Sequence, residues 1–174
     1  GEQHRTIRHH RVIVMRGWVH YSQDGDMEIR DDIAPCAGRF RLDVFRRGEL
    51  VERVDEDNLV VVGSKLALSR LIGGAFTGKN ITTIGFGTSG TAPVAGNTVL
   101  TGAFTKPLDG LPTYPASNQV RFAFSLATTE ANGLAIMEFG LITADGTLFA
   151  RKVRASALNK DSDLSFSGSW TLTF

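Results

Sequence analysis

The chain of 174 residues has one cysteine, Cys36, and lacks any apolar run close to the length of a bilayer span. A single cysteine excludes an intrachain disulfide and a cysteine cage around a metal ion. A membrane-spanning helix needs about 18 consecutive apolar residues. The first ten residues, GEQHRTIRHH, also lack the apolar segment of a secretory signal. We therefore expect an inert thiol, no membrane partner and assembly in a cytoplasm.

Histidine is missing from most of the chain, because all four histidines lie within the first 20 residues. A Ser-His-Asp catalytic site in the rest of the chain would need this N-terminal segment to fold over it. His4, His9 and His10 lie close enough in sequence to suggest a zinc or nickel site. No cysteine and no zinc-finger spacing supports such a site. A basic surface segment is the favoured interpretation, and we expect no metal ion and no other cofactor.

The net charge is only +1, but the charges are unevenly distributed. Residues 1–20 are basic, and the stretch DGDMEIRDD at 24–32 is acidic. Basic and acidic blocks in series are typical of a segment that docks on another surface. We predict that residues 1–38 form an extended N-terminal docking arm. The residues expected to meet a partner are Arg5, Arg8, Arg11, Arg16, Asp24, Asp26, Asp31 and Asp32.

The acidic block also resembles a calcium-binding loop, with Asp24, Asp26 and Glu28 at the first, third and fifth positions. Ile29 occupies the sixth position, where such loops need glycine, and Pro35 occupies the twelfth. A solvated acidic connection is therefore favoured over a calcium site.

The pattern of residues 39–54 predicts a β-hairpin. Phe40, Leu42 and Val44 share one face of a strand, and Arg39, Arg41 and Asp43 share the other. The sequence RRGE then supplies a turn. The best helix candidate is SKLALSRLIGG, with Ser64 as its cap and Gly73-Gly74 as its end.

Six further stretches have the composition of strands, separated by glycine, proline and Asp-Gly turns. They are ITTIGF, TVLTGAFTK, QVRFAFSLA, LAIMEFGLIT, TLFARKVRA and LSFSGSWTLTF. The clearest hairpin turns at Ala144-Asp145-Gly146. We predict an all-β fold: an antiparallel β-sandwich at 39–174 with one short helix, preceded by the arm.

The stretch IGFGTSGTAP contains Gly85, Gly87 and Gly90 in the G-x-G-x-x-G spacing of dinucleotide-binding loops. That motif requires a helix after the third glycine. Here Pro93, Gly96-Asn97 and the β-prone TVLTGAFT follow instead. We therefore predict a structural loop whose glycines permit tight turning and close packing between strands.

Glu138 lies within the apolar strand LAIMEFGLIT, where a carboxylate needs a partner. Arg151, Lys152 and Lys160 are the candidates, and a structural ion pair is favoured over catalysis. The basic residues Arg151, Lys152 and Arg154 have no aromatic stacking set beside them. The near-neutral charge also argues against a long phosphate-binding track, so nucleic acid is not an expected partner.

Several segments in series resemble a family of structural proteins of tailed bacteriophages and prophages. They are RFRLDVFRRGELVERVDED, NLVVVGSKLALSRLIGG, ITTIGFGTSGTAPVAGNTVLTGAFTK, EFGLITADGTLFARKV, the lysine at 160 and SWTLTF. The resemblance covers roughly residues 39–174 and implies a tail-fibre, baseplate or other accessory virion protein. It supplies no catalytic residues and no counterpart for residues 1–38.

From these observations we expect a non-enzymatic structural component of a phage virion, most readily of its tail. It would dock through its arm on other virion proteins and on copies of itself, with a trimer favoured. The alternatives are a capsid decoration protein and a receptor- or carbohydrate-binding module using Phe76, Tyr114 or Trp18. A hydrolase acting through Glu138 is the least favoured.

Overall fold

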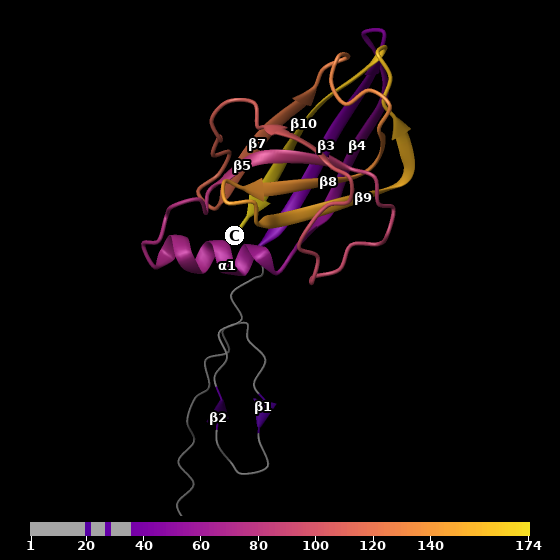
Figure 1. Ribbon diagram of the computed structural model, residues 1–174. Coiled ribbons are helices and arrows are strands. Elements are labelled where there is room, and N and C mark those ends of the chain that lie inside the picture. Colours follow the sequence, from indigo (N-terminus) through magenta and orange to yellow (C-terminus); the bar gives the residue numbers. More distant parts are fainter. Residues whose placement is uncertain (1–19, 22–26, 29–35) are drawn as a thin grey trace, which may run out of the picture. The chain divides into compact units, whose positions relative to one another are not determined.

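The computed structural model describes residues 20–21, 27–28 and 36–174 (Figure 1). The chain divides into two compact units, residues 1–35 and 36–174. Within the first, β1 (His20–Tyr21) pairs antiparallel with β2 (Met27–Glu28). The other candidate residues of this segment lie outside the described residues. They are the eight predicted docking residues Arg5, Arg8, Arg11, Arg16, Asp24, Asp26, Asp31 and Asp32, with His4, His9, His10 and Trp18.

The second unit is an antiparallel sheet of eight strands in the order β6-β5-β8-β9-β4-β3-β10-β7. One short helix, α1 (Gly63–Ile72), accompanies them in the described residues. The prediction of a mostly antiparallel β body with one short helix is confirmed. The strands are β3 (Ala37–Arg46), β4 (Glu49–Val60), β5 (Ile81–Gly87), β6 (Phe104–Pro107), β7 (Gln119–Leu126), β8 (Ala135–Thr143), β9 (Leu148–Asn159) and β10 (Leu164–Thr173).

This sheet curls back on itself, as the crossing of β8 over β3 and β10 in Figure 1 shows. In the strand ladder, its two halves join where Leu59 and Val60 of β4 pair with Arg151 and Ala150 of β9. Phe86 of β5 and Phe124 of β7 stand near opposite ends of the strand order, yet their ring centroids lie 6.3 Å apart. The hydrogen bonding therefore gives one continuous sheet curled into a half-barrel, and the predicted two-sheet sandwich is not confirmed.

The core fills the inside of this curl with aromatic rings. Phe40 is fully buried, and its ring centroid lies 5.7 Å from Phe124, 4.9 Å from Phe139 and 5.1 Å from Trp170. These partners come from β7, β8 and β10, so one side chain connects both halves of the sheet. Alternation along β3 also buries Leu42 and Val44, as predicted.

The predicted hairpin forms, and its turn has the expected backbone. Arg47 and Gly48 have φ angles of +52° and +85°, which suit a tight two-residue hairpin turn. The first strand begins earlier than the predicted domain boundary after residue 38. Ala37 and Gly38 already pair with Thr173 and Leu172 of β10.

Helix α1 differs from the prediction at its start. Val62 is the N-cap residue, and Ser64 lies inside the helix, buried and without a side-chain capping bond. Ser64 and Ala67 form the buried face, so packing against the body outweighs the capping preference of serine. The end agrees with the prediction, because Gly74 has a φ of +81° and the Ala75 amide donates to the Arg70 carbonyl.

The predicted strand TVLTGAFTK is mostly wrong, since only its end belongs to β6 and residues 98–103 form a loop. The amide of Thr101 donates to the buried carboxylate of Glu138 instead of to a strand partner. Leu100 packs close to Gly85 and Gly140, on neighbouring strands. A tertiary contact therefore holds this segment across the sheet.

Lys160 is almost fully buried at the junction of β9 and β10. Its Nζ donates to the Thr128 carbonyl at 3.1 Å, Asn132 Oδ1 at 2.8 Å and the Asp161 carbonyl at 2.9 Å. Burial lowers the pKa of this lysine. The ammonium thus ties the β7–β8 loop to the turn before β10, and it is not the partner of Glu138.

We expect Phe40→Ala to lower the free energy of unfolding by about 3–5 kcal/mol, because it removes the ring shared by both halves of the sheet. Phe76→Ala is the matched control, since Phe76 is 66% exposed. Urea unfolding followed by tryptophan fluorescence measures both. Equal, small effects would contradict a core organised around Phe40.

Candidate functional site

The three glycines of the G-x-G-x-x-G match lie on β5 and in the loop after it, and no helix follows them. A Cβ atom at Gly85 would lie 2.5 Å from Leu100 Cδ1, and one at Gly87 would lie 2.5 Å from Glu138 Oε1. A Cβ at Gly90 would lie 2.6 Å from Met137 Cε. The glycines therefore allow the loop at 88–103 to pack closely on β5 and β8. Without a helix N-terminus after Gly90, this loop lacks the pyrophosphate seat of a dinucleotide site.

A buried polar centre lies beneath this loop, formed by Glu138, Arg151, Asn97 and the amides of Ser89 and Thr101. Glu138 is completely buried, and its Oε2 accepts a hydrogen bond from Arg151 Nε at 2.6 Å. Oε1 accepts from the amides of Thr101 at 2.6 Å and Ser89 at 3.3 Å. Arg151 Nη1 also donates to Asn97 Oδ1 at 2.9 Å. We call this set the Glu138 centre.

Strand register explains why Arg151 is the partner of Glu138 and Lys152 is not. Arg151 lies opposite Gly140, on the same face of β8 as Glu138, whereas Lys152 lies opposite the core residue Phe139. Lys152 Nζ instead pairs with Glu56 Oε2 at 2.6 Å and donates to the Asp57 carbonyl. A carboxylate that is buried and held by three donors is arranged to fix the loop and has no face open to a substrate.

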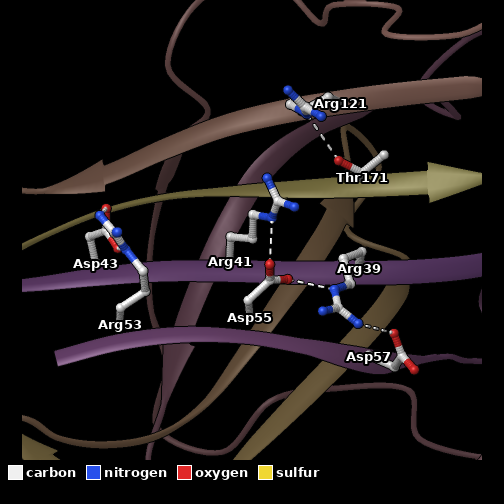
Figure 2. Close-up of polar contacts among 8 residues, drawn as sticks. All are labelled: Arg39, Arg41, Asp43, Arg53, Asp55, Asp57, Arg121 and Thr171. Atoms are coloured by element: carbon white, nitrogen blue, oxygen red, sulfur yellow. Dashed lines mark hydrogen bonds and ion pairs between the residues drawn. The ribbon is translucent and has the colours of Figure 1, made fainter.

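The outer face of β4, β3, β10 and β7 is polar, as Figure 2 shows. We call it the polar face, and register arranges its side chains in rows that run across the strands. The three central rows are Asp57–Arg39–Thr171–Arg121, Asp55–Arg41–Ser169–Ala123 and Arg53–Asp43–Ser167–Ser125. The cause is simple alternation, because the residues between them lie on the inner side of the sheet, where Leu42, Phe122 and Trp170 are buried.

Ion pairs connect β3 and β4 across this face. Arg53 makes a forked contact with Asp43, at 2.7 Å and 3.0 Å. Asp55 accepts from Arg39 at 2.5 Å and lies 3.0 Å from Arg41 Nε. The hydrogen bond from Arg53 lowers the pKa of Asp43, and the hydrogen bond from Arg39 lowers the pKa of Asp55. Both carboxyl groups therefore stay ionised at neutral pH.

Arg121 has a different environment on the same face. Its Nε donates to Thr171 Oγ1 at 3.1 Å, and no carboxylate of the described residues lies within ion-pair distance. The central rows hold four arginines and three aspartates, so they carry one positive charge in excess. The excess lies on the β10–β7 side, because the aspartates lie on β3 and β4.

An open groove with a volume of about 560 Å³ crosses this face. Its polar lining consists of Arg41, Asp43, Arg53, Asp55, Ser167 and Ser169. The sequence placed Arg39, Arg41 and Asp43 on one strand face but did not predict the groove. The sequence does show serine or threonine at alternate positions of LSFSGSWTLTF, and this pattern could have predicted a polar outer face.

A metal site and sugar-binding aromatic residues were alternatives to the favoured interpretation of the sequence. In the part of the chain that the structure describes, no three histidine, cysteine or acidic side chains gather as a metal site would require. No helix of these residues is both long and apolar enough to span a membrane. Phe76 and Tyr114 are 66% and 73% exposed, but neither lines the groove.

Comparison of the chain with protein-family models, with curated proteins and with solved structures found no match.

We expect Glu138→Gln to destabilise the body by about 3–5 kcal/mol, because it leaves the Arg151 guanidinium buried without a counter-charge. Glu56→Gln removes one charge from an ion pair whose acid is 59% exposed, and should cost less than about 1 kcal/mol. Chemical denaturation at neutral pH compares the two variants. A similar loss in both would contradict the central role of the buried pair.

Proposed function

We propose that the chain is a non-enzymatic structural component of a tailed-bacteriophage virion, associated with the tail, its fibres or its baseplate. In this proposal the curled sheet acts as a sandwich-like body, and residues 1–35, the part of the expected arm that precedes the sheet, act as an extended arm. The arm docks the body on other virion proteins and on neighbouring copies, and symmetry multiplies contacts that are weak singly.

The observation behind the proposal is that two of the segments that resemble phage structural proteins meet at the Glu138 centre. The Gly-rich segment contributes Ser89, Asn97 and Thr101 to the Glu138 centre, and its Gly87 leaves the space that the carboxylate occupies. The segment EFGLITADGTLFARKV contributes Glu138 and Arg151. The residues that resemble the phage family therefore form a buried structural contact. Residues with this role maintain a fold, and this favours a structural component over an enzyme.

Other acidic side chains of the body also favour a structural component over an enzyme. Besides Glu138, the acids Glu130, Asp145 and Asp163 are held by Lys106, Lys79 and Arg46 respectively. Hydrogen bonds from Lys79, Thr143 and Thr147 hold the pKa of Asp145 well below its usual range. Acids in such pairs are engaged in linking strands and turns.

The location on the particle is tested by immunogold electron microscopy of purified phage, using an antibody raised against the body. Label at the tail or its tip supports the proposal. Label spread over the head would favour the alternative of a capsid decoration protein. Absence of the chain from purified particles would contradict a virion role.

Deletion of residues 1–35 tests the docking arm. It should stop before Ala37, because that residue already pairs in the sheet. We expect the shortened chain to keep the β-type circular dichroism of the body but to be absent from particles. The full-length chain, expressed from the same promoter, is the control for incorporation. Incorporation of the shortened chain at the normal level would contradict docking through the arm.

A further inference from the structure

We propose that the polar face binds an acidic polysaccharide, laid along β10 with a carboxylate held between Arg41 and Arg121. The inference goes beyond the proposed function, because it assigns a ligand to a surface and holds wherever the chain sits on a particle. It depends on the rows and the groove already described. The hydroxyl groups, the arginines, the charge and the groove each favour a different property of the ligand.

The hydroxyl groups of β10 supply a polar track. Each outward position of this strand carries serine or threonine: Ser165, Ser167, Ser169, Thr171 and Thr173. Outward positions on a strand repeat about every 6.6–6.8 Å. A hydroxyl group both donates and accepts hydrogen bonds, which suits a ligand that presents many hydroxyl groups of its own. Because these side chains are short, the surface above β10 lies below the longer arginine side chains on either side.

Two arginines border the track on opposite sides. Arg41 of β3 lies opposite Ser169, and Arg121 of β7 lies opposite Thr171. Figure 2 shows them approaching β10 from its two sides. Neighbouring strands are about 4.8 Å apart, so the β3 and β7 backbones are separated by roughly 10 Å. The two arginines are also offset by two residues along β10, so their backbone positions are roughly 12 Å apart. Their long side chains can bring guanidinium groups from both sides to one carboxylate above β10.

Charge favours this ligand over a nucleic acid. Among the described residues, the Arg121 guanidinium donates one hydrogen bond, to the Thr171 hydroxyl group, and Arg41 shares Asp55 with Arg39. This leaves donor capacity for an added anion. The three aspartates of the central rows would, however, repel a nucleic acid strand, which carries a phosphate on every unit and has few hydroxyl groups to donate to them. A polysaccharide that carries both carboxylates and many hydroxyl groups meets both conditions, since Asp43 and Asp55 can accept hydrogen bonds from sugar hydroxyls.

The position of the groove favours a chain over a small molecule. Its volume of about 560 Å³ lies within the range of about 300–1,000 Å³ common for ligand pockets, and Arg41 and Ser169 line it, but Arg121 does not. A ligand that occupies the groove and also meets Arg121 must therefore extend beyond it across β10. The central rows contain no aromatic ring on which a neutral sugar could stack. Recognition must therefore come from the arginines and hydroxyl groups.

The test is isothermal titration calorimetry of the full chain with three probes: alginate oligosaccharides, neutral dextran and single-stranded oligothymidylate. We expect binding to alginate and none to dextran. Charge-assisted hydrogen bonds contribute about 1.5–3 kcal/mol each, so Arg121→Gln should weaken alginate binding by about 10- to 100-fold. Arg41→Gln should weaken it similarly.

Arg47→Gln is the matched control, because this arginine is 83% exposed and pairs with Asp163, outside the central rows. It should bind alginate as the unaltered chain does. Thermal melting establishes that each variant is folded. Failure of the unaltered chain to bind alginate, or equal binding by Arg121→Gln, would overturn the proposal. Equally tight binding of oligothymidylate would also overturn it, because the face would then bind polyanions without preference for a polysaccharide. Equal binding of dextran would overturn the role of the carboxylate.

Discussion

The ion pair between Glu138 and Arg151 is the interaction on which the loop at 88–103 and its packing against β5 and β8 depend. It lies on the outer side of the curled sheet, where a strand face would ordinarily meet water. Burying a carboxylate there is tolerated only because a guanidinium and two backbone amides satisfy it. Those amides belong to the loop at 88–103, so satisfying the charge also fixes the loop. The glycines of β5 and β8 leave the space that this loop needs.

Strands β4, β3, β10 and β7 form one half of the sheet, and its inner and outer sides differ in chemistry. The inner side packs Phe40 and Trp170 into the aromatic core that closes the curl. The outer side carries guanidinium, carboxylate and hydroxyl groups in register. Exposed ion pairs of this kind add little stability. Alternation decides which side chains face outward, and the proposal of a ligand depends on the hydroxyl groups of β10 and on the arginines that flank them.

Local pattern predicted the elements whose stability is local or repetitive. The hairpin of β3 and β4, its turn at Arg47-Gly48 and the end of α1 at Gly73-Gly74 were predictable, because alternation and backbone freedom act over a few residues. The start of α1 and the stretch TVLTGAFTK were not. In both, contacts with distant parts of the chain outweigh the local preference, through the burial of Ser64 and the hydrogen bond from Thr101 to Glu138.

The sequence by itself determined the class of fold, the need of Glu138 for a basic partner and the structural role of its glycines. Each follows from the chemistry of one residue or one short period. Only the tertiary structure decided that the sheet is continuous and curled, that Arg151 is the partner, and that β10 lies between Arg41 and Arg121. Strand order and register decide these points, because they bring together residues far apart in the chain, and no local pattern encodes which strands become neighbours.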